Sequence, residues 1–304
     1  MKNNTKVVLT EREHEHRSRL VKSFEDVSNL KDYTLMPDGV WGSKAIIRSG
    51  NVTIDSSQLD LEFTIPFDDN LEADEGEIII YNLSDTTIKQ LKAKAKISIT
   101  AGYEGDTGVI FDGYITKKST NREGADKVTT LKVIDDIKQK ESLNLSYSAG
   151  VTAQHILKDL LQKVKLPVGK ISMKRNWTYE NDVTIDEALE SAIKKYAEVC
   201  GVSVFTSCGK LYCCQLKDIA REGYFNVNEN TGMIGSPLPF EETITAEDYE
   251  DTIEGYEIEM LLQHRMSTGA KINLKSEQYN GTFYVKSGEH IFNESECVTK
   301  VKAV

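Results

Sequence analysis

The feature that most constrains the fold is a pattern of short alternating strands that occurs in both halves of the chain. The stretch "KISITAGYEGDTGVIFDGYI" (96–115) aligns without a gap on "KINLKSEQYNGTFYVKSGEH" (271–290), at an offset of 175 that sets Gly113 over Gly288. "VTTLKV" (128–133) then matches "VTKVKA" (298–303) at an offset of 170, as a shorter loop would give. Alternating strands also align by chance, so both explanations stay open. A genuine duplication is favoured, and it predicts two related β units with an insert between them.

The first β unit is predicted from strands of period two. Every second residue of "QLDLEFTIPF" (58–67) is apolar, which indicates a half-buried strand, and Pro66 is expected to end it. "EIIIYN" follows as a second strand, and Ser84 is placed to cap a short helix because its hydroxyl can accept from the first helical turn. Since closure removes unpaired strand edges, this mixture favours a small barrel over residues 45–142.

A helical period appears in the middle of the chain. "SAGVTAQHILKDLLQKVKLPVG" (148–169) carries its apolar residues on one helical stripe. A second helix is predicted to begin with a capping box of Thr184 and Glu187 and to end at Gly201. "VSVFTSCGKLYCCQL" (202–216) indicates a hairpin that turns at Ser207 to Lys210.

These patterns predict a mainly β fold with four regions. A charged N-terminal arm over 1–44 precedes the first small β-barrel over 45–142, an α+β middle domain over 143–217 and a second, related barrel over 218–304. Strands resume in the last region with alternating residues around Ile258 and again further on. The sequence therefore predicts two related barrels that flank a helix-containing insert.

Composition excludes some classes of partner. The chain has 304 residues, with 48 acids against 37 bases and a net charge of −11, and it shows no basic stripe with interleaved aromatics. Such a surface repels nucleic acid and anionic membranes, although DNA could pass through without binding. No apolar run reaches the roughly 20 residues of a membrane helix, and the first residues lack the apolar core of a secretory signal. Sequence-specific DNA binding and a membrane anchor are not expected.

Candidate metal ligands are few and poorly spaced. His14 and His16 in "EHEH" could chelate a metal, but a charged, solvated arm explains them better. The five cysteines lack paired C-x-x-C knuckles, so buried thiols in a reducing compartment are favoured over zinc or disulfides. They are Cys200, Cys208, Cys213, Cys214 and Cys297. No metal site and no cofactor are predicted.

Candidate catalytic groups are equally weak. The chain has no G-x-S-x-G elbow, no papain-like cysteine motif and no P-loop. His155, His264 and His290 are each expected to be surface or half-buried residues. A small hydrolase with a site around His155 and Glu187 stays open as an alternative, as does a carbohydrate-binding or adhesion module that uses Trp177 to Tyr179 as an aromatic platform. No catalytic residue is predicted, and the chain is not expected to be an enzyme.

The order of several segments carries a family resemblance. "NVTIDSSQLDLEFTIPF", "EIIIYNLSDTTIKQL", "ISITAGYEGDTGVIFDGYI", "TGMIGSP" and the closing "GTFYVKSGEHIFNESECVTKVKAV" resemble the tail hub proteins of contractile phages, with a closer likeness to hubs of PBSX-type defective prophages and phage-tail-like bacteriocins. The resemblance covers roughly residues 45–304, and the N-terminal arm matches nothing in it. Its motifs are patterns of a fold rather than catalytic signatures.

The resemblance implies a structural role. Such hubs form a homotrimeric ring at the distal end of the tail tube, where two related barrels in each subunit give a pseudo-sixfold surface toward the hexameric tube and a threefold end toward the spike. Expected partners are further copies of the chain, the tail tube protein, the spike and other baseplate proteins, in a virion tail or bacteriocin particle assembled in the bacterial cytoplasm. A negative lumen would let DNA slide. Some relatives carry a fused peptidoglycan hydrolase, which a chain ending at a strand is not expected to have.

Overall fold

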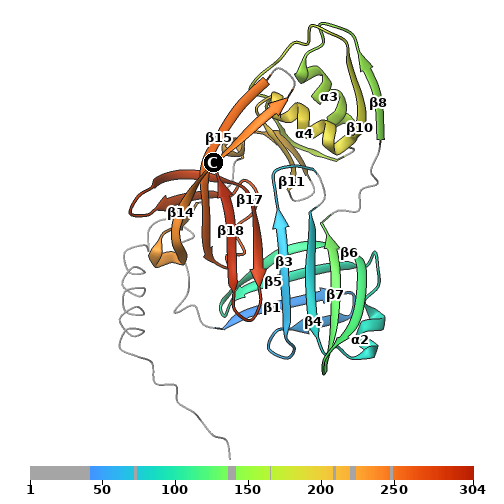
Figure 1. The fold of residues 1–304 in the computed structure, drawn as a ribbon, viewed down its shortest axis with the longest axis vertical. Coiled ribbons are helices and arrows are strands. Elements are labelled where there is room, and N and C mark those ends of the chain that lie inside the picture. The colour runs from blue at the N-terminus through green and yellow to red at the C-terminus, as the bar shows by residue number, and fades with distance from the viewer. Residues whose placement is uncertain are drawn as a thin grey trace, which may run out of the picture.

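The computed structural model describes residues 42–71, 74–135, 142–164, 166–207, 210–219, 224–246 and 249–304. The fold is mainly β, as the sequence predicts, and Figure 1 shows its two β units with the helix-containing unit above them. The predicted arm, including His14 and His16, lies almost entirely outside the described residues, and so does Cys208. No described helix is long and apolar enough to span a membrane.

One 13-stranded sheet runs through both β units. In spatial order it contains β14 (Met233–Ala246), β15 (Tyr249–Leu261), β18 (Cys297–Ala303), β17 (Asn280–Phe292), β3 (Leu61–Phe67), β4 (Glu75–Tyr81), β7 (Asp126–Ile134), β6 (Asp106–Glu123), β5 (Lys96–Tyr103), β1 (Ser43–Ser49) and β2 (Val52–Asp55). In addition, β16 (Lys271–Lys275) pairs with β17, and β13 (Phe225–Val227) pairs with β16. The two units are thus joined where β17 pairs with β3.

Each β unit encloses its own core. Figure 1 shows β1 and β5 crossing the layer of β3, β4 and β7, and the apolar faces of these strands meet between the layers. Ile47, Phe63, Ile80 and Ile99 are among the buried residues of this first core. The second core is smaller and is built from β13, β15, β16, β17 and β18. Burial of every second strand residue is what the alternating sequence requires.

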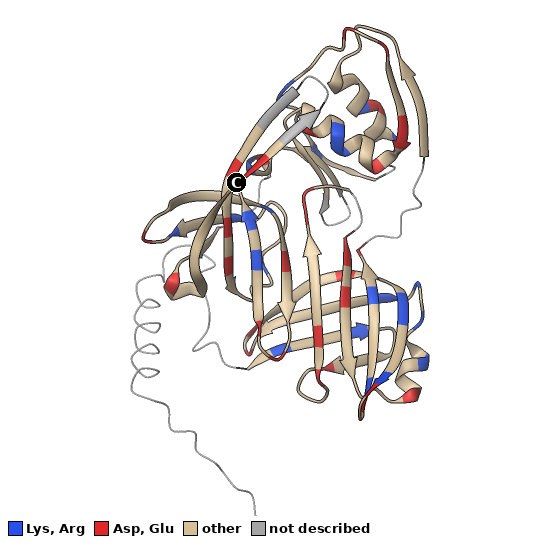
Figure 2. Cartoon of the chain, viewed as in Figure 1, with Lys and Arg blue, Asp and Glu red and all other residues tan. Residues whose placement is uncertain are grey.

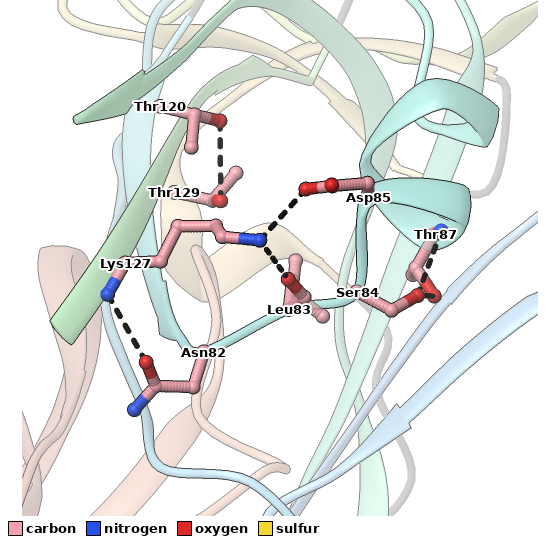
Figure 3. Close-up of polar contacts among 8 residues, drawn as sticks. All are labelled: Asn82, Leu83, Ser84, Asp85, Thr87, Thr120, Lys127 and Thr129. Atoms are coloured by element: carbon pink, nitrogen blue, oxygen red, sulfur yellow. Dashed lines mark hydrogen bonds and ion pairs between the residues drawn. The ribbon is translucent and has the colours of Figure 1, made fainter. Parts of the chain in front are cut away.

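The helix of the first unit begins as the sequence predicts. α2 (Asp85–Gln90) follows β4, and the Ser84 hydroxyl accepts from the Thr87 amide at 3.1 Å (Figure 3). Lys127 on β7 reaches across to the same end of the helix, where its Nζ contacts Asp85 at 2.7 Å. The cap satisfies a helical N–H that would otherwise lack a partner.

The expectation that Pro66 ends its strand is wrong. β3 continues to Phe67, and Pro66 lies opposite Glu289 of β17. The pairing between β3 and β4 stops at Thr64, so on that side the missing N–H of Pro66 costs no ladder bond.

The middle unit combines two helices with two small sheets. Its elements are β8 (Ser142–Tyr147), α3 (Ala153–Lys163), β9 (Val168–Ile171), β10 (Val183–Ala188), α4 (Leu189–Val199), β11 (Ser203–Ser207) and β12 (Lys210–Cys214), followed by the short 3-10 helix η1 (Leu216–Asp218). A second 3-10 helix, η2 (Glu229–Thr231), lies between β13 and β14 of the second β unit. β11 and β12 form the predicted hairpin, closing at Ser207 opposite Lys210. Buried residues of α3 and α4 share one core with β10 and β11, and Leu71 from the connection between β3 and β4 joins it.

The start of the second helix differs from the prediction. Thr184 and Glu187 lie on β10 rather than in a capping box, and α4 begins at Leu189 after Ala188, which makes no side-chain cap. Residues 183–186 alternate between buried and exposed and the whole strand pairs with β8, so period two prevails over the local capping signal. Gly201, with φ of +66°, follows the last helical turn at the predicted end.

Candidate assembly site

The two β units repeat one strand arrangement. β4, β7, β6 and β5 lie side by side in the first unit, and β15, β18, β17 and β16 lie in the same order in the second. β3 flanks β4 as β14 flanks β15. Both the chain order and the spatial order correspond, which is the arrangement that an internal duplication produces.

The correspondence between the two β units extends to the register of strand pairing and to the position of a β-bulge. Tyr114 and Ile115 pair with Ile134 and Val133, and a bulge follows before the pair Lys117–Lys132. In the second unit Val285 pairs with Ala303, and the same bulge precedes the pair Ser287–Lys302. A bulge is a specific irregularity, so its recurrence 170 residues later is stronger evidence than alternation alone.

The pairing also corrects one part of the sequence alignment. Lys96 lies opposite Tyr114, 18 residues on, whereas Lys271 lies opposite Tyr284, only 13 residues on. The hairpin of the second unit is therefore shorter, and the offset of 175 holds for β5 and β16 but not for β6 and β17. Gly288 corresponds to Lys118 rather than to Gly113, because the paired strands of the second hairpin, Lys271–Lys275 with Asn280–Tyr284, are shorter than those of the first.

Ion pairs on the face opposite the two cores follow the same repeat. Glu77 on β4 pairs with Lys132 on β7 at 3.1 Å, and Glu257 on β15 pairs with Lys302 on β18 at 3.2 Å. Figure 2 shows acidic and basic residues interspersed along the strands of both units. This exposed face thus carries both signs of charge, although the whole chain has a net charge of −11.

The two β units differ at the outer edge of β17 and of its counterpart β6, because only β17 is paired with a further strand there. His290 on β17 is bonded to Thr299 at 2.9 Å and is covered by β3, where Ile65 lies opposite it and Phe67 packs on its ring. The equivalent pair in the first unit is Thr120 and Thr129, whose hydroxyls are 3.2 Å apart (Figure 3). Thr129 is buried but Thr120 is exposed, because no described strand covers the outer side of β6 there.

β14 is the second free edge. Among the described residues it pairs only with β15, whereas β3, its counterpart, pairs with both β4 and β17. Leu238 on β14 is 61 % exposed, which is high for a leucine. Unpaired strand edges readily accept another strand, so residues 116–123 of β6 and the outer side of β14 form the candidate assembly edges of this chain.

A polar clasp also holds the two β units together. It consists of Asp106 from the first β unit and His264 and Arg265 from the second. Asp106, at the tip of the β5–β6 hairpin, accepts two 2.7 Å hydrogen bonds from the Arg265 guanidinium, and it contacts the His264 Nε2 atom at 3.0 Å. A Cβ atom at Gly108 would lie 2.0 Å from the His264 ring, so a larger residue there would displace the ring. The Tyr103 hydroxyl also donates to the Cys297 carbonyl at 2.8 Å.

The clasp should weaken in acid. Burial raises the pKa of Asp106, but hydrogen bonds and charge from Arg265 and His264 outweigh it and hold that pKa below the ordinary value. A carboxyl whose pKa is depressed by folding stabilises the fold above its unfolded pKa, about 4, and loses that contribution as pH falls through the folded pKa. Urea unfolding at pH 6 and pH 3 should show a stability difference between wild type and Asp106→Asn that shrinks at pH 3; an unchanged difference contradicts this assignment.

A cavity of about 570 Å³ separates the middle unit from the sheet. Lys286 crosses it from β17 and pairs with Glu242 at 3.1 Å and Asp69 at 3.5 Å, and the Ser203 hydroxyl of the middle unit donates to Asp69. Lys286 is the extra residue of the repeated bulge, where the first unit has the exposed Thr116. Bulges redirect side chains, and this one points a lysine at the joint between units.

The cysteines do not form a reactive or metal-binding cluster among the described residues. Burial raises the pKa of Cys200 to about 11 and of Cys213 to about 12, so both thiols stay protonated at neutral pH. Cys200 packs in the core of the middle unit, as predicted. Cys214 is also buried with a raised pKa, and the pKa of Cys297 rises to about 11. No group of three metal ligands occurs in the described ranges.

The three histidines lie in two parts of the fold, His155 in the middle unit and His264 and His290 in the second β unit. His155 is an exposed residue of α3 that pairs with Asp159 at 3.6 Å, and no hydrogen bond or ion pair among the described residues joins it to Glu187 on β10. His264 belongs to the clasp. His290 differs from the expectation of a surface or half-buried residue: it is 1 % exposed, and burial lowers its pKa to about 4.

The proposed aromatic platform is not assembled. Trp177 is 40 % exposed, but Tyr179 is buried against Tyr196 with ring centroids 6.1 Å apart. The sequence could indicate the aromatic residues but not their opposite burial.

Comparisons with known proteins agree with this architecture. The family Baseplate hub gp41 matches residues 70–290. No curated protein matches the chain. The fold is similar to a tail protein from Neisseria meningitidis MC58, with a TM-score of 0.57 and 11 % identity over 86 % of this chain and 96 % of that one.

Two further solved structures share the fold. The 43 kDa tail protein of prophage MuSo2 from Shewanella oneidensis has a TM-score of 0.53 and 8 % identity, covering 86 % of this chain and 97 % of its own. The E. coli c3393 protein, a type VI secretion component described as similar to the T4 tail proteins gp27 and gp5, has a TM-score of 0.53 and 9 % identity, with 85 % and 76 % covered. With the family match spanning more than half of the sequence, the chain belongs to the Baseplate hub gp41 family of phage tail proteins.

Proposed function

We propose that this hub protein is a non-catalytic homotrimer that adapts a hexameric tail tube to a trimeric spike. The observation that carries the proposal is the duplicated sheet: two related units in one chain turn three subunits into six similar positions. Its partners would be the tube protein, the spike and other baseplate proteins of a virion tail or bacteriocin particle, assembled in the bacterial cytoplasm. No described cluster of catalytic groups favours the alternatives of a cell-wall hydrolase or a carbohydrate-binding module.

The free edges suggest how the ring closes. Inside one chain the outer side of β17 is paired with β3. β6 is the counterpart of β17, and β14 is the counterpart of β3. The same contact made between subunits would therefore pair the outer side of β6 in one subunit with β14 of the next, with Thr120 near Leu238. Three such contacts between subunits would alternate with the three inside them, which closes a ring and pairs the free edges of β6 and β14.

Thr120 provides a test of ring closure. Glu123 and Asp126 close a two-residue turn, and alternate residues of an antiparallel strand bond to opposite sides, so the N–H of Thr120 points away from β7. Thr120→Pro removes that donor and spares the bonds to β7. We expect subunit association to weaken by roughly 1–3 kcal/mol at each junction, because a carbonyl of the neighbouring strand loses its partner.

Native mass spectrometry of the full chain, alone and co-expressed with its tube and spike proteins, measures the effect. The wild type should give three copies per spike trimer, and Thr120→Pro should give mainly monomer with an unchanged circular dichroism spectrum. Thr120→Val, which keeps the N–H, is the matched control and should assemble. A stable wild-type monomer that binds neither tube nor spike overturns the proposed function. Normal assembly of Thr120→Pro overturns only the proposed edge contact.

A further inference from the structure

The cavity between the middle unit and the sheet has two walls of different charge. Its lining on the middle unit comes from residues 174–175, α4, the start of β11 and η1. Its opposite lining comes from the β3–β4 connection, β14, β15, β17 and β18. Six bases and four acids line it, although the whole chain has 48 acids and 37 bases. A concave site lined by one excess charge concentrates ions of the opposite sign.

The basic residues of the two walls differ in their ion pairing. On the sheet wall Lys286 is neutralised by Asp69 and Glu242, and Lys302 is held by Glu257. On the middle-unit wall, by contrast, the ammonium groups of three lysines make no ion pair with any described residue, although the charge of Lys194 acts on the carboxyls of Asp68 and Glu198. These lysines are Lys174, Lys194 and Lys217. Arg175 lines the same wall.

One acid, Glu198, lines the same wall as these bases. Glu198 lies one turn after Lys194 on α4, and burial raises its pKa even though Lys194 and Lys286 act to lower it. The middle-unit wall therefore carries four bases and one acid, and its three lysines are exposed residues.

We propose that this cavity is a binding site for a small multivalent anion, held by Lys174, Lys194 and Lys217 with Arg175 beside them. A volume of about 570 Å³ lies within the roughly 300–1,000 Å³ of small-molecule sites. Phosphate and carboxylate groups are the anions that lysine and arginine bind in proteins. A ligand with several such groups would cross-link α4 and η1 from within the joint and hold the middle unit in a fixed position on the sheet.

The test uses the full chain and two probes, inorganic pyrophosphate and citrate, each compared with sodium chloride at equal ionic strength. We expect pyrophosphate or citrate at about 100 times its Kd to raise the melting temperature by several degrees, and sodium chloride to have no such effect. The two probes separate phosphate from carboxylate chemistry, and saturable titration calorimetry gives the affinity of each. Equal melting temperatures in all three salts overturn the proposal.

Variants locate the site. Lys194→Gln with Lys217→Gln should weaken binding of the preferred probe by about tenfold or more, because each lysine contributes a charged contact. The matched control removes two exposed lysines elsewhere, Lys89→Gln with Lys92→Gln, and should bind as the wild type does. Equal binding by both double variants overturns the assignment to this cavity. The oligomeric state is measured separately, so failure here is distinct from failure of the proposed trimer.

Discussion

Asp106→Ala is expected to destabilise the chain by roughly 2–4 kcal/mol, because it removes the centre of the clasp between the two β units and leaves a charged partner without its carboxylate. The Asp106 side chain is only 11 % exposed, and Arg265 contacts it with two nitrogens at 2.7 Å. Urea unfolding followed by circular dichroism measures the loss. A double-mutant cycle with Arg265→Ala should show strong coupling, since either change breaks the same contact.

An exposed ion pair is the matched control for the clasp. Lys127 and Asp85 are also 2.7 Å apart, but the Asp85 side chain is 78 % exposed. Exposed pairs contribute little, since solvent screens them and holding two long side chains costs entropy. Asp85→Asn should therefore unfold with the wild type. If Asp85→Asn and Asp106→Ala have the same effect, burial is not what makes the clasp strong.

Leu160→Ala is the second change with a large expected effect. Leu160 is fully buried on α3 in the core of the middle unit, which α4, β10 and β11 complete. Removing a buried leucine side chain costs roughly 2–5 kcal/mol, depending on how far the cavity collapses. Differential scanning calorimetry should show the loss.

The same variant tests the proposed domain at 143–217. If the middle unit folds by itself, Leu160→Ala should lower one thermal transition and leave a second one, from the β units, in place. Ile99→Ala in the first β core is the matched variant and should shift the other transition. A single transition that both variants lower equally contradicts an independent middle domain. The insertion of Leu71 into the middle core indicates some coupling between the units.

Local sequence patterns were sufficient to predict a helix or strand where one hydrophobic period dominates over several residues. The strand β3, the cap at Ser84 and the apolar stripe of α3 all follow from spacing and capping chemistry. The predicted capping box at Thr184 was wrong because Thr184 lies on β10, whose strand partner is distant in the sequence. Its residues fit a helix start, but as a strand they pair with β8, where Thr184 lies opposite Ser146 and Glu187 opposite Leu143. A window of a few residues does not contain those partners.

The sequence by itself determined the mainly β composition, the helical insert and the existence of an internal repeat between the two halves. These features depend on hydrophobic periods that can be recognised within short segments. Only the tertiary structure decided the register of that repeat, because hairpin length can change without disturbing the alternation on either side. It alone brought Asp106 to Arg265, 159 residues apart. It also distinguished Thr120 from His290: the two occupy equivalent positions, but a neighbouring strand covers only the histidine. Coverage of an edge depends on which strands meet in space, and no local pattern encodes it.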